Sequence, residues 1–149
     1  FNFRGVGKSG GTFGGGIAEQ DDVKAALTFP SAAPDIAPPW LRLVGYSFGV
    51  SVAVPVAVND SRVSLLALVS PVISDSGWEQ LMRYSKPKLL ISGNNDFVIS
   101  LPQFQQHIQD IPEPKEYHII SGADHFWFGY EEEVAHKVAR FLVASFLMH

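Results

Sequence analysis

Leu41-Arg42-Leu43-Val44-Gly45-Tyr46-Ser47-Phe48-Gly49 is the stretch that says most about how this chain of 149 residues folds. Its first four residues form a short apolar run that predicts a buried strand, and residues 45–49 match the pattern G-x-S-x-G. A serine hydroxyl becomes a useful nucleophile when it projects from a sharp turn between a strand and a helix, where a histidine can reach its proton. Many matches to so short a pattern are plain turns, so the residues that follow must decide.

The two glycines of this pattern have an expected steric role. In such a turn the serine backbone is strained, and bulky side chains two residues to either side would collide. Gly45 and Gly49 are expected to remove that collision. The backbone N–H of Phe48 would then point at the oxyanion that develops on an attacked carbonyl group.

Two further polar residues stand where a predicted strand meets a loop. Asp96 lies in Gly93-Asn94-Asn95-Asp96, directly after the apolar run 89–91. His125 lies in Gly122-Ala123-Asp124-His125, directly after residues 117–120. Open parallel sheets place their chemistry at such strand ends. The order serine, acid, histidine along the chain is that of the α/β-hydrolases.

On these residues the chain resembles the α/β-hydrolase superfamily along its full length. Within it, the chain is most similar to the small, lidless serine hydrolases related to dienelactone hydrolase and to the predicted α/β-superfamily hydrolases. The motifs that carry the resemblance are Asn2-Phe3-Arg4-Gly5-Val6-Gly7-Lys8-Ser9, Gly45-Tyr46-Ser47-Phe48-Gly49, Gly93-Asn94-Asn95-Asp96 and Ala123-Asp124-His125-Phe126. The resemblance implies an α/β fold, with a mostly parallel sheet and helices on both faces, in a single domain over residues 1–149.

The resemblance also implies roles for the three polar residues. Ser47 would be the nucleophile, and His125 the general base and then the general acid. Asp96 would orient His125 and stabilise its cation. The predicted function is cleavage of an ester, thioester or related acyl bond through an acyl-enzyme intermediate. The alternative is a non-catalytic binding or interaction protein with the same fold.

Two other aspartates compete for the role of the acid. Asp75 follows the preceding strand run and is the serious alternative, because some relatives place the acid there. Asp124 is adjacent to His125 and is expected to shape the loop, since neighbouring residues seldom orient each other's rings. Tyr46, Phe126 and Trp127 are the predicted substrate-binding residues, although packing of Phe126 and Trp127 in the core is equally compatible with the sequence.

The remaining segments alternate between strand and helix patterns. Strands are expected at residues 1–3, 63–69, 88–91 and 116–120, helices after residue 19 and at residues 101–111 and 131–147, and a surface connection at residues 30–39. Residues 48–58 are rich in valine and alternate like a strand, yet the resemblance implies a helix there. Pro55 would kink or shorten that helix. Residues 71–86 leave no room for a large lid.

The glycine-rich stretch near the start of the chain suggests a nucleotide site at first sight. Gly5, Gly7 and Gly10 fit G-x-G-x-x-G, but no helix begins where a pyrophosphate would need one, and the acids at residues 21 and 22 come too early. Asn2 stands where the phosphate-loop pattern requires glycine. The glycines are better explained by tight turns in a loop that borders the active-site end of the sheet.

Composition excludes several other classes of protein. The chain has no cysteine, a net charge of −4 and no cluster of lysine and arginine, which argues against disulfides, thiolate metal sites and nucleic acid as a partner. No apolar run approaches the roughly 20 residues that span a bilayer. We expect no cofactor, no metal, a small-molecule acyl substrate and a cytoplasmic location. The oligomeric state is left open.

The first residue, Phe1, already lies within an apolar stretch. We therefore expect either that about 60 residues of the fold are missing at the amino terminus, by the usual size of such domains, or that this piece is inactive alone. In the family, those residues include the loop that supplies the second oxyanion donor.

Overall fold

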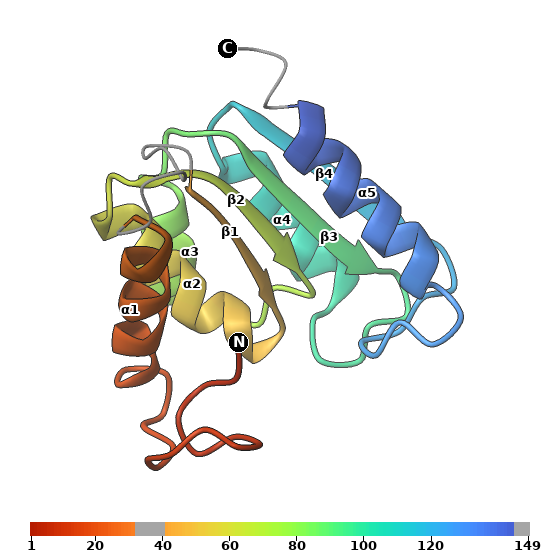
Figure 1. The fold of residues 1–149 in the computed structure, drawn as a ribbon. Helices are drawn as coiled ribbons and strands as arrows, with labels where there is room; N and C mark the ends of the chain where they lie inside the picture. Colours follow the sequence, from red (N-terminus) through yellow and green to blue (C-terminus); the bar gives the residue numbers. More distant parts are fainter. Residues whose placement is uncertain (32–40, 145–149) are drawn as a thin grey trace.

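Four parallel strands form the sheet of this protein. The computed structural model describes residues 1–31 and 41–144. The strands, β1 (Leu41–Tyr46), β2 (Val63–Val69), β3 (Lys88–Gly93) and β4 (Lys115–Ile120), lie in the order β1-β2-β3-β4, each parallel to the next. The helices are α1 (Glu19–Ser31), α2 (Phe48–Asn59), α3 (Asp75–Leu81), α4 (Leu101–Asp110) and α5 (Glu131–Ala144). Figure 1 shows α1, α2 and α3 on one side of the sheet and α5 on the other. The predicted α/β class, with a parallel sheet covered on both faces, is confirmed.

Both faces of the central strands are buried, because successive side chains point to opposite sides. Leu66, Leu68 and Leu90 pack in a core with residues of α1, α2, α3 and α4. Val69 and Ile91 pack in a second core, against side chains of α5. Strands buried on both faces read as continuous apolar runs, which is why β2 and β3 could be recognised in the sequence.

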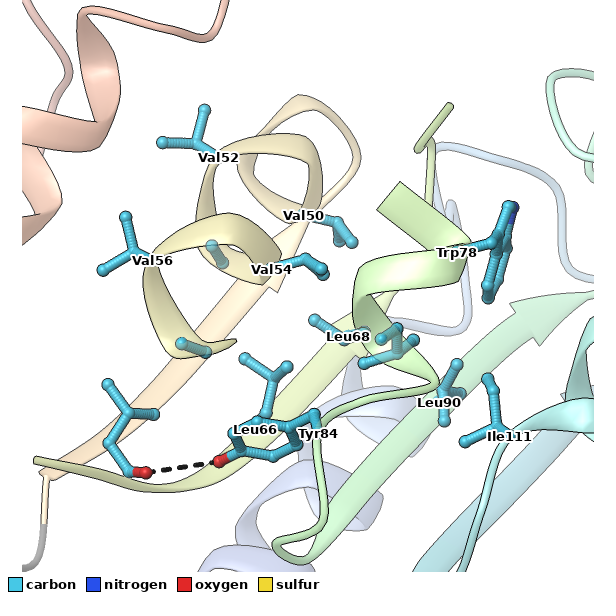
Figure 2. Close-up of a cluster of buried hydrophobic side chains, with 14 of the residues drawn as sticks. Val50, Val52, Val54, Val56, Leu66, Leu68, Trp78, Tyr84, Leu90 and Ile111 are labelled. Carbon is cyan, nitrogen blue, oxygen red and sulfur yellow. Dashed lines mark hydrogen bonds between the residues drawn. The ribbon is translucent and has the colours of Figure 1, made fainter. Parts of the chain in front are cut away.

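Helix α2 overrides the strand preference of its own sequence. Figure 2 shows Val52 and Val56 projecting on the side of α2 that faces α1, while Val50 and Val54 point toward α3 and the sheet. All four side chains are buried. A helix that is apolar all round is stable where it is enclosed by other elements, so tertiary burial outweighs the weak helix preference of valine. The helix implied by the family resemblance is confirmed.

Pro55 does not end this helix, which continues to Asn59. Of the two expected outcomes, a kink or a shortened helix, the shortening is wrong and the kink stays a prediction. Proline removes one N–H from the helix interior and so leaves the carbonyl group of residue 51 without its usual helical donor. One turn later, the Asn59 side-chain amide donates to the Pro55 carbonyl oxygen at 2.8 Å.

Residues 1–3 do not form the predicted strand. A strand needs a neighbour for its backbone hydrogen bonds, and within the described residues no strand lies beside this segment. Phe3 instead packs edge-on against Phe48, with their ring centroids 5.7 Å apart.

Parts of two predicted segments lie outside the described residues. These are most of the connection at residues 30–39 and residues 145–147, the end of the last predicted helix. Among the helices that are described, none is long and apolar enough to cross a membrane.

Candidate active site

Ser47 occupies the sharp turn between β1 and α2. Its backbone has φ 50° and ψ −118°, a conformation that non-glycine residues rarely adopt and that surrounding structure must hold in place. The Ser47 N–H donates to the Val69 carbonyl oxygen at 3.0 Å, and the N–H of Val50 donates to the Ser47 carbonyl oxygen at 2.9 Å. The turn is therefore anchored to the neighbouring strand β2 on one side and to α2 on the other.

The two glycines of the pattern differ in their surroundings. A Cβ atom on Gly45 would lie 3.0 Å from the Gly49 carbonyl oxygen and from backbone atoms of Val50, so this position has no room for a side chain. A Cβ atom on Gly49 would meet nothing within 4 Å. The expected collision is thus present at Gly45, while at Gly49 the steric expectation is wrong, because the space around its Cβ position is open.

Phe48 begins α2, directly after Ser47. An N–H in the first turn of a helix has no acceptor within that helix, and the same end carries the positive end of the helix dipole. Phe48 and Ser47 line the same groove. A negatively charged oxygen beside Ser47 could accept a hydrogen bond from this N–H.

Ser47, His125 and Asp96 form one continuous chain of hydrogen bonds. Ser47 Oγ lies 2.8 Å from His125 Nε2. His125 Nδ1 lies 2.9 and 3.0 Å from the two carboxylate oxygens of Asp96. The Asp96 carboxylate is fully buried, and the N–H groups of Val98 and Ile99 donate to its Oδ1 atom at 2.9 and 3.0 Å. These bonds fix the carboxylate, which in turn fixes the orientation of the imidazole ring.

Backbone contacts hold the loops of Asp96 and His125 together. The N–H of Asn95 donates to the Ala123 carbonyl oxygen at 3.0 Å, and Asn94 Oδ1 accepts from the Gly122 N–H at 2.7 Å. A Cβ atom on Gly93 would overlap the carbonyl group of Ala123. The end of β3 therefore packs directly on the loop after β4, which brings the carboxylate within reach of the histidine.

Neither of the two other aspartates considered for the role of the acid bonds to the His125 ring within the described residues. Asp75 is in the first turn of α3, and within the described residues the carboxylate bonded to His125 is that of Asp96. Asp124 Oδ1 accepts from the N–H groups of Phe126 and Trp127 at 2.9 and 3.1 Å, the loop-shaping arrangement expected for it.

The predicted substrate-binding residues line a different hollow from Ser47. Tyr46, Phe126 and Trp127 border an apolar hollow of about 440 Å³ against α5. The Tyr46 hydroxyl donates to the His125 carbonyl oxygen at 2.8 Å, and burial raises the pKa of this tyrosine, with the Asp96 and Asp124 charges adding to the effect. These contacts make Tyr46 a support for the histidine loop.

The two aromatic neighbours of His125 have separate environments. Trp127 is buried in the core beneath α5, and its indole N–H donates to Ser70 Oγ at 3.1 Å. Phe126 is exposed and meets the His125 ring edge-on, with centroids 5.8 Å apart. Core packing thus accounts for Trp127, while Phe126 lies at the rim of the histidine.

A groove of about 840 Å³ opens beside Ser47 and His125. Gly15, Gly16 and Ile17 form part of its wall. The glycine-rich loop predicted to border this end of the sheet therefore does so. Gly15 and Gly16 adopt φ values of +66° and +87°, which agrees with the tight turns expected there.

Glu19 organises this glycine loop, a role that the sequence did not suggest. Its buried carboxylate accepts hydrogen bonds from the N–H groups of Gly14 and Gly16 at 2.6 and 2.8 Å. The bond from Gly14, more than any other interaction, holds the pKa of Glu19 below its usual value. Asp22 adds a second anchor by pairing with Arg4 at 2.7 Å. No local pattern in the sequence distinguishes an acid at a helix start that bonds the preceding loop from one that does not.

The described residues contain no group of three or more His, Asp or Glu side chains arranged to hold a metal ion. The hydrogen bond between Ser47 Oγ and His125 Nε2 offers a path for a proton from the hydroxyl group to the imidazole.

Comparison with solved structures agrees with the geometry. The structure of an α/β serine hydrolase homologue from Coxiella burnetii superposes with a TM-score of 0.83, at 32% identity, over 93% of this chain and 65% of that one. The chain has the α/β-hydrolase fold. An α/β serine hydrolase without lid from Xanthomonas campestris has the same fold, with a TM-score of 0.78 and 23% identity over 96% of this chain and 64% of the other.

A relative found by sequence comparison, an uncharacterised protein from Rickettsia prowazekii, matches a similar share of this chain. It is 27% identical over 155 residues, which cover 95% of this chain and 63% of the relative. No protein-family model matches the chain. The chain thus spans between 63% and 65% of the length of these three α/β-hydrolase and uncharacterised relatives.

Proposed function

We propose that this protein is a serine hydrolase that cleaves an ester, thioester or related acyl bond through an acyl-enzyme intermediate. The observation that carries the proposal is the unbroken hydrogen-bond chain from Ser47 Oγ through the His125 ring to Asp96. Nucleophile, base and orienting carboxylate are the parts that acyl transfer needs. The names of the structural neighbours support a hydrolase in general.

In the proposed acylation step, Ser47 Oγ attacks the carbonyl carbon of the substrate while His125 Nε2 takes the hydroxyl proton. Asp96 stabilises the imidazolium that forms. The negative charge on the carbonyl oxygen receives a hydrogen bond from the Phe48 N–H. His125 then gives its proton to the departing oxygen or sulfur atom, and a water molecule hydrolyses the acyl-enzyme by the same steps.

The open groove favours accessible, uncharged substrates. Between β2 and β3 the chain carries only the seven-residue helix α3, which is compatible with the predicted absence of a large lid. A small-molecule substrate and a cytoplasmic location remain predictions.

Covalent labelling tests this function. Incubation of the full-length protein with a fluorophosphonate, followed by intact-mass measurement, should show one adduct on the native protein and none on Ser47→Ala. Ser64→Ala is the matched control, because Ser64 lies in β2 and its hydroxyl donates to the Leu41 carbonyl oxygen. It should label like the native protein.

An adduct that persists on Ser47→Ala, or no adduct on the native protein, would contradict the proposal. Tight ligand binding without labelling would instead favour the non-catalytic alternative.

A further inference from the structure

We propose that the loops after β3 and β4 form the binding site for the leaving group of the substrate, and that this group is an aromatic or similarly flat, apolar alcohol or thiol. Phe97 and Phe126 contact it directly, beside the ring of His125. The inference rests on the proposed hydrolase function and names the class of substrate on one side of the bond that breaks.

Three exposed phenylalanine rings form one continuous surface at this end of the sheet, which we call the aromatic patch. They are Phe97, Phe126 and Phe128, with exposed fractions of 67%, 55% and 74%. The Phe126 ring centroid lies 5.5 Å from that of Phe97 and 5.9 Å from that of Phe128. Single exposed apolar side chains are common on proteins, whereas rings gathered in contact are typical of a binding surface.

The aromatic patch adjoins the histidine of the proposed triad. The His125 ring centroid lies 5.9 Å from that of Phe97 and 5.8 Å from that of Phe126. Phe97 directly follows Asp96 in the chain, and Phe126 directly follows His125. Two exposed rings from two different loops therefore flank the group that protonates the leaving atom.

The chemistry of the proposed acylation step assigns this patch to the leaving group. His125 Nε2 gives its proton to the departing oxygen or sulfur, so that atom must lie within hydrogen-bond distance of the imidazole. A ring one carbon beyond that atom can reach Phe97 or Phe126, because aromatic pairs interact over centroid distances of about 4.5–7 Å. None of the three rings of the aromatic patch lines the groove beside Ser47, which is left for the acyl group.

The turn that carries Phe97 is fixed by the triad itself. Asp96 Oδ1 accepts hydrogen bonds from the N–H groups of Val98 and Ile99, on the far side of Phe97 in the chain. Ile99 is buried. The carboxylate that orients His125 therefore also holds this exposed ring in place.

The loop after β4 is held as firmly. Trp127 has φ 64°, a conformation that is rare for a bulky residue and that its surroundings must maintain. Its indole N–H donates to Ser70 Oγ from the core, and Asp124 Oδ1 accepts from the N–H groups of Phe126 and Trp127. The loop thus buries the tryptophan and leaves Phe126 and Phe128 exposed on either side of it. Rings on a fixed loop lose little conformational entropy when a ligand binds.

The side chains of the aromatic patch set the class of the leaving group. Phenylalanine has no hydrogen-bonding atom in its side chain, so a polar group placed on it loses hydration without gaining a partner. A flat apolar ring buries area there and packs edge-on or offset against the phenylalanines. We therefore expect arylmethyl esters to be better substrates than esters of small or polar alcohols.

Two isomeric esters distinguish the leaving-group side from the acyl side. Benzyl acetate carries its ring on the alcohol, and methyl phenylacetate carries the same ring on the acyl group. The full-length native protein should hydrolyse benzyl acetate with a kcat/KM about tenfold above that of methyl phenylacetate, the effect of one or two aromatic contacts.

The variants Phe97→Ala and Phe126→Ala each remove one ring. The ratio of the two kcat/KM values should fall about threefold in each and to about one in the double variant. A structural disturbance of His125 would lower both values together and leave their ratio unchanged. Phe29→Ala is the matched control, because Phe29 is an exposed phenylalanine on α1, and it should keep the native ratio.

Hydrolysis of p-nitrophenyl acetate by the native protein separates the two proposals. Turnover of this ester without a preference for benzyl acetate over its isomer would overturn the leaving-group inference and leave the hydrolase function standing. A native preference that survives in the double variant would overturn the role of the aromatic patch. No turnover of any ester would overturn the hydrolase proposal, and the leaving-group inference with it.

Discussion

The two ends of the parallel sheet both hold polar side chains, but they use them differently. At the amino end, Lys88 Nζ donates to the carbonyl oxygens of Pro112 and Pro114, at 2.9 and 3.2 Å. Lys86 and Lys115 also each donate to two backbone carbonyl oxygens. At the carboxyl end, Ser47 and His125 bond to each other and line an open groove.

The difference separates structural polar groups from reactive ones. A lysine whose donors are satisfied by carbonyl oxygens of its own chain fixes loops and has little left for a ligand. Ser47 and His125 line the groove. Backbone hydrogen bonds hold the turn of Ser47, and the Asp96 carboxylate holds the ring of His125. Strand β3 connects the two ends, because it begins at Lys88 and leads into the turn that carries Asp96.

The largest expected effect is at the carboxyl end. Asp96→Asn should lower kcat by about 10⁴-fold, because an amide leaves the imidazole in the wrong tautomer and does not stabilise its cation. Asp75→Asn, the matched change at the competing aspartate, should leave kcat within about twofold of native. The measurement is steady-state hydrolysis of an activated ester by the full-length protein. The opposite ranking of the two variants would identify Asp75 as the acid.

The second prediction concerns Lys88, at the amino end. Burial lowers the pKa of Lys88 to about 8, from 10.5 for an exposed lysine. The folded state therefore binds this proton more weakly than the unfolded state. The charged form penalises folding below pH 8, and the penalty disappears as the pH rises to 10.5. Through the Lys88 proton alone, the free energy of unfolding should rise by about 3 kcal/mol across that interval.

Lys88→Met should abolish this contribution, and ester hydrolysis at neutral pH should stay within about twofold of native. Urea unfolding of both proteins between pH 7 and 10.5 measures the difference. Identical pH dependence in the two proteins, or a large loss of activity in the variant, would break the distinction between the two ends.

The smallest expected effect tests the contact between the two loops. Gly93→Ala should lower the free energy of unfolding by about 1–3 kcal/mol, because the added methyl group overlaps the Ala123 carbonyl and must displace the histidine loop. Gly49→Ala is the control, since a Cβ atom there meets nothing within 4 Å, and its change should stay below about 1 kcal/mol. Chemical denaturation compares them. Equal changes in the free energy of unfolding would mean that the loop after β4 can move to accommodate the added methyl group without destabilising the protein.

Local patterns predicted much of the candidate site. Ser47, Asp96 and His125 each follow a strand that could be recognised in the sequence. Parallel strands bring their carboxyl ends to one edge of the sheet. The failures were the strand at residues 1–3, for which a run of apolar residues is not enough without a neighbouring strand, the shortening of α2 at Pro55, and the crowding expected at Gly49. The short helix α3 was not predicted. Glu19 was missed, because a buried acid that bonds a preceding loop has no local pattern.

The sequence by itself determined strands β1 to β4, helices α1, α4 and α5, the turn at Ser47 and the three polar residues at strand ends. These depend on the geometry of the chain over a few residues, which short patterns record. Only the tertiary structure decided that residues 48–59 are helix, that Asp96 lies against His125, and that Phe97 and Phe126 pack together beside it. Those outcomes depend on burial and contact between residues far apart in the chain, and these arise only when the whole core is assembled.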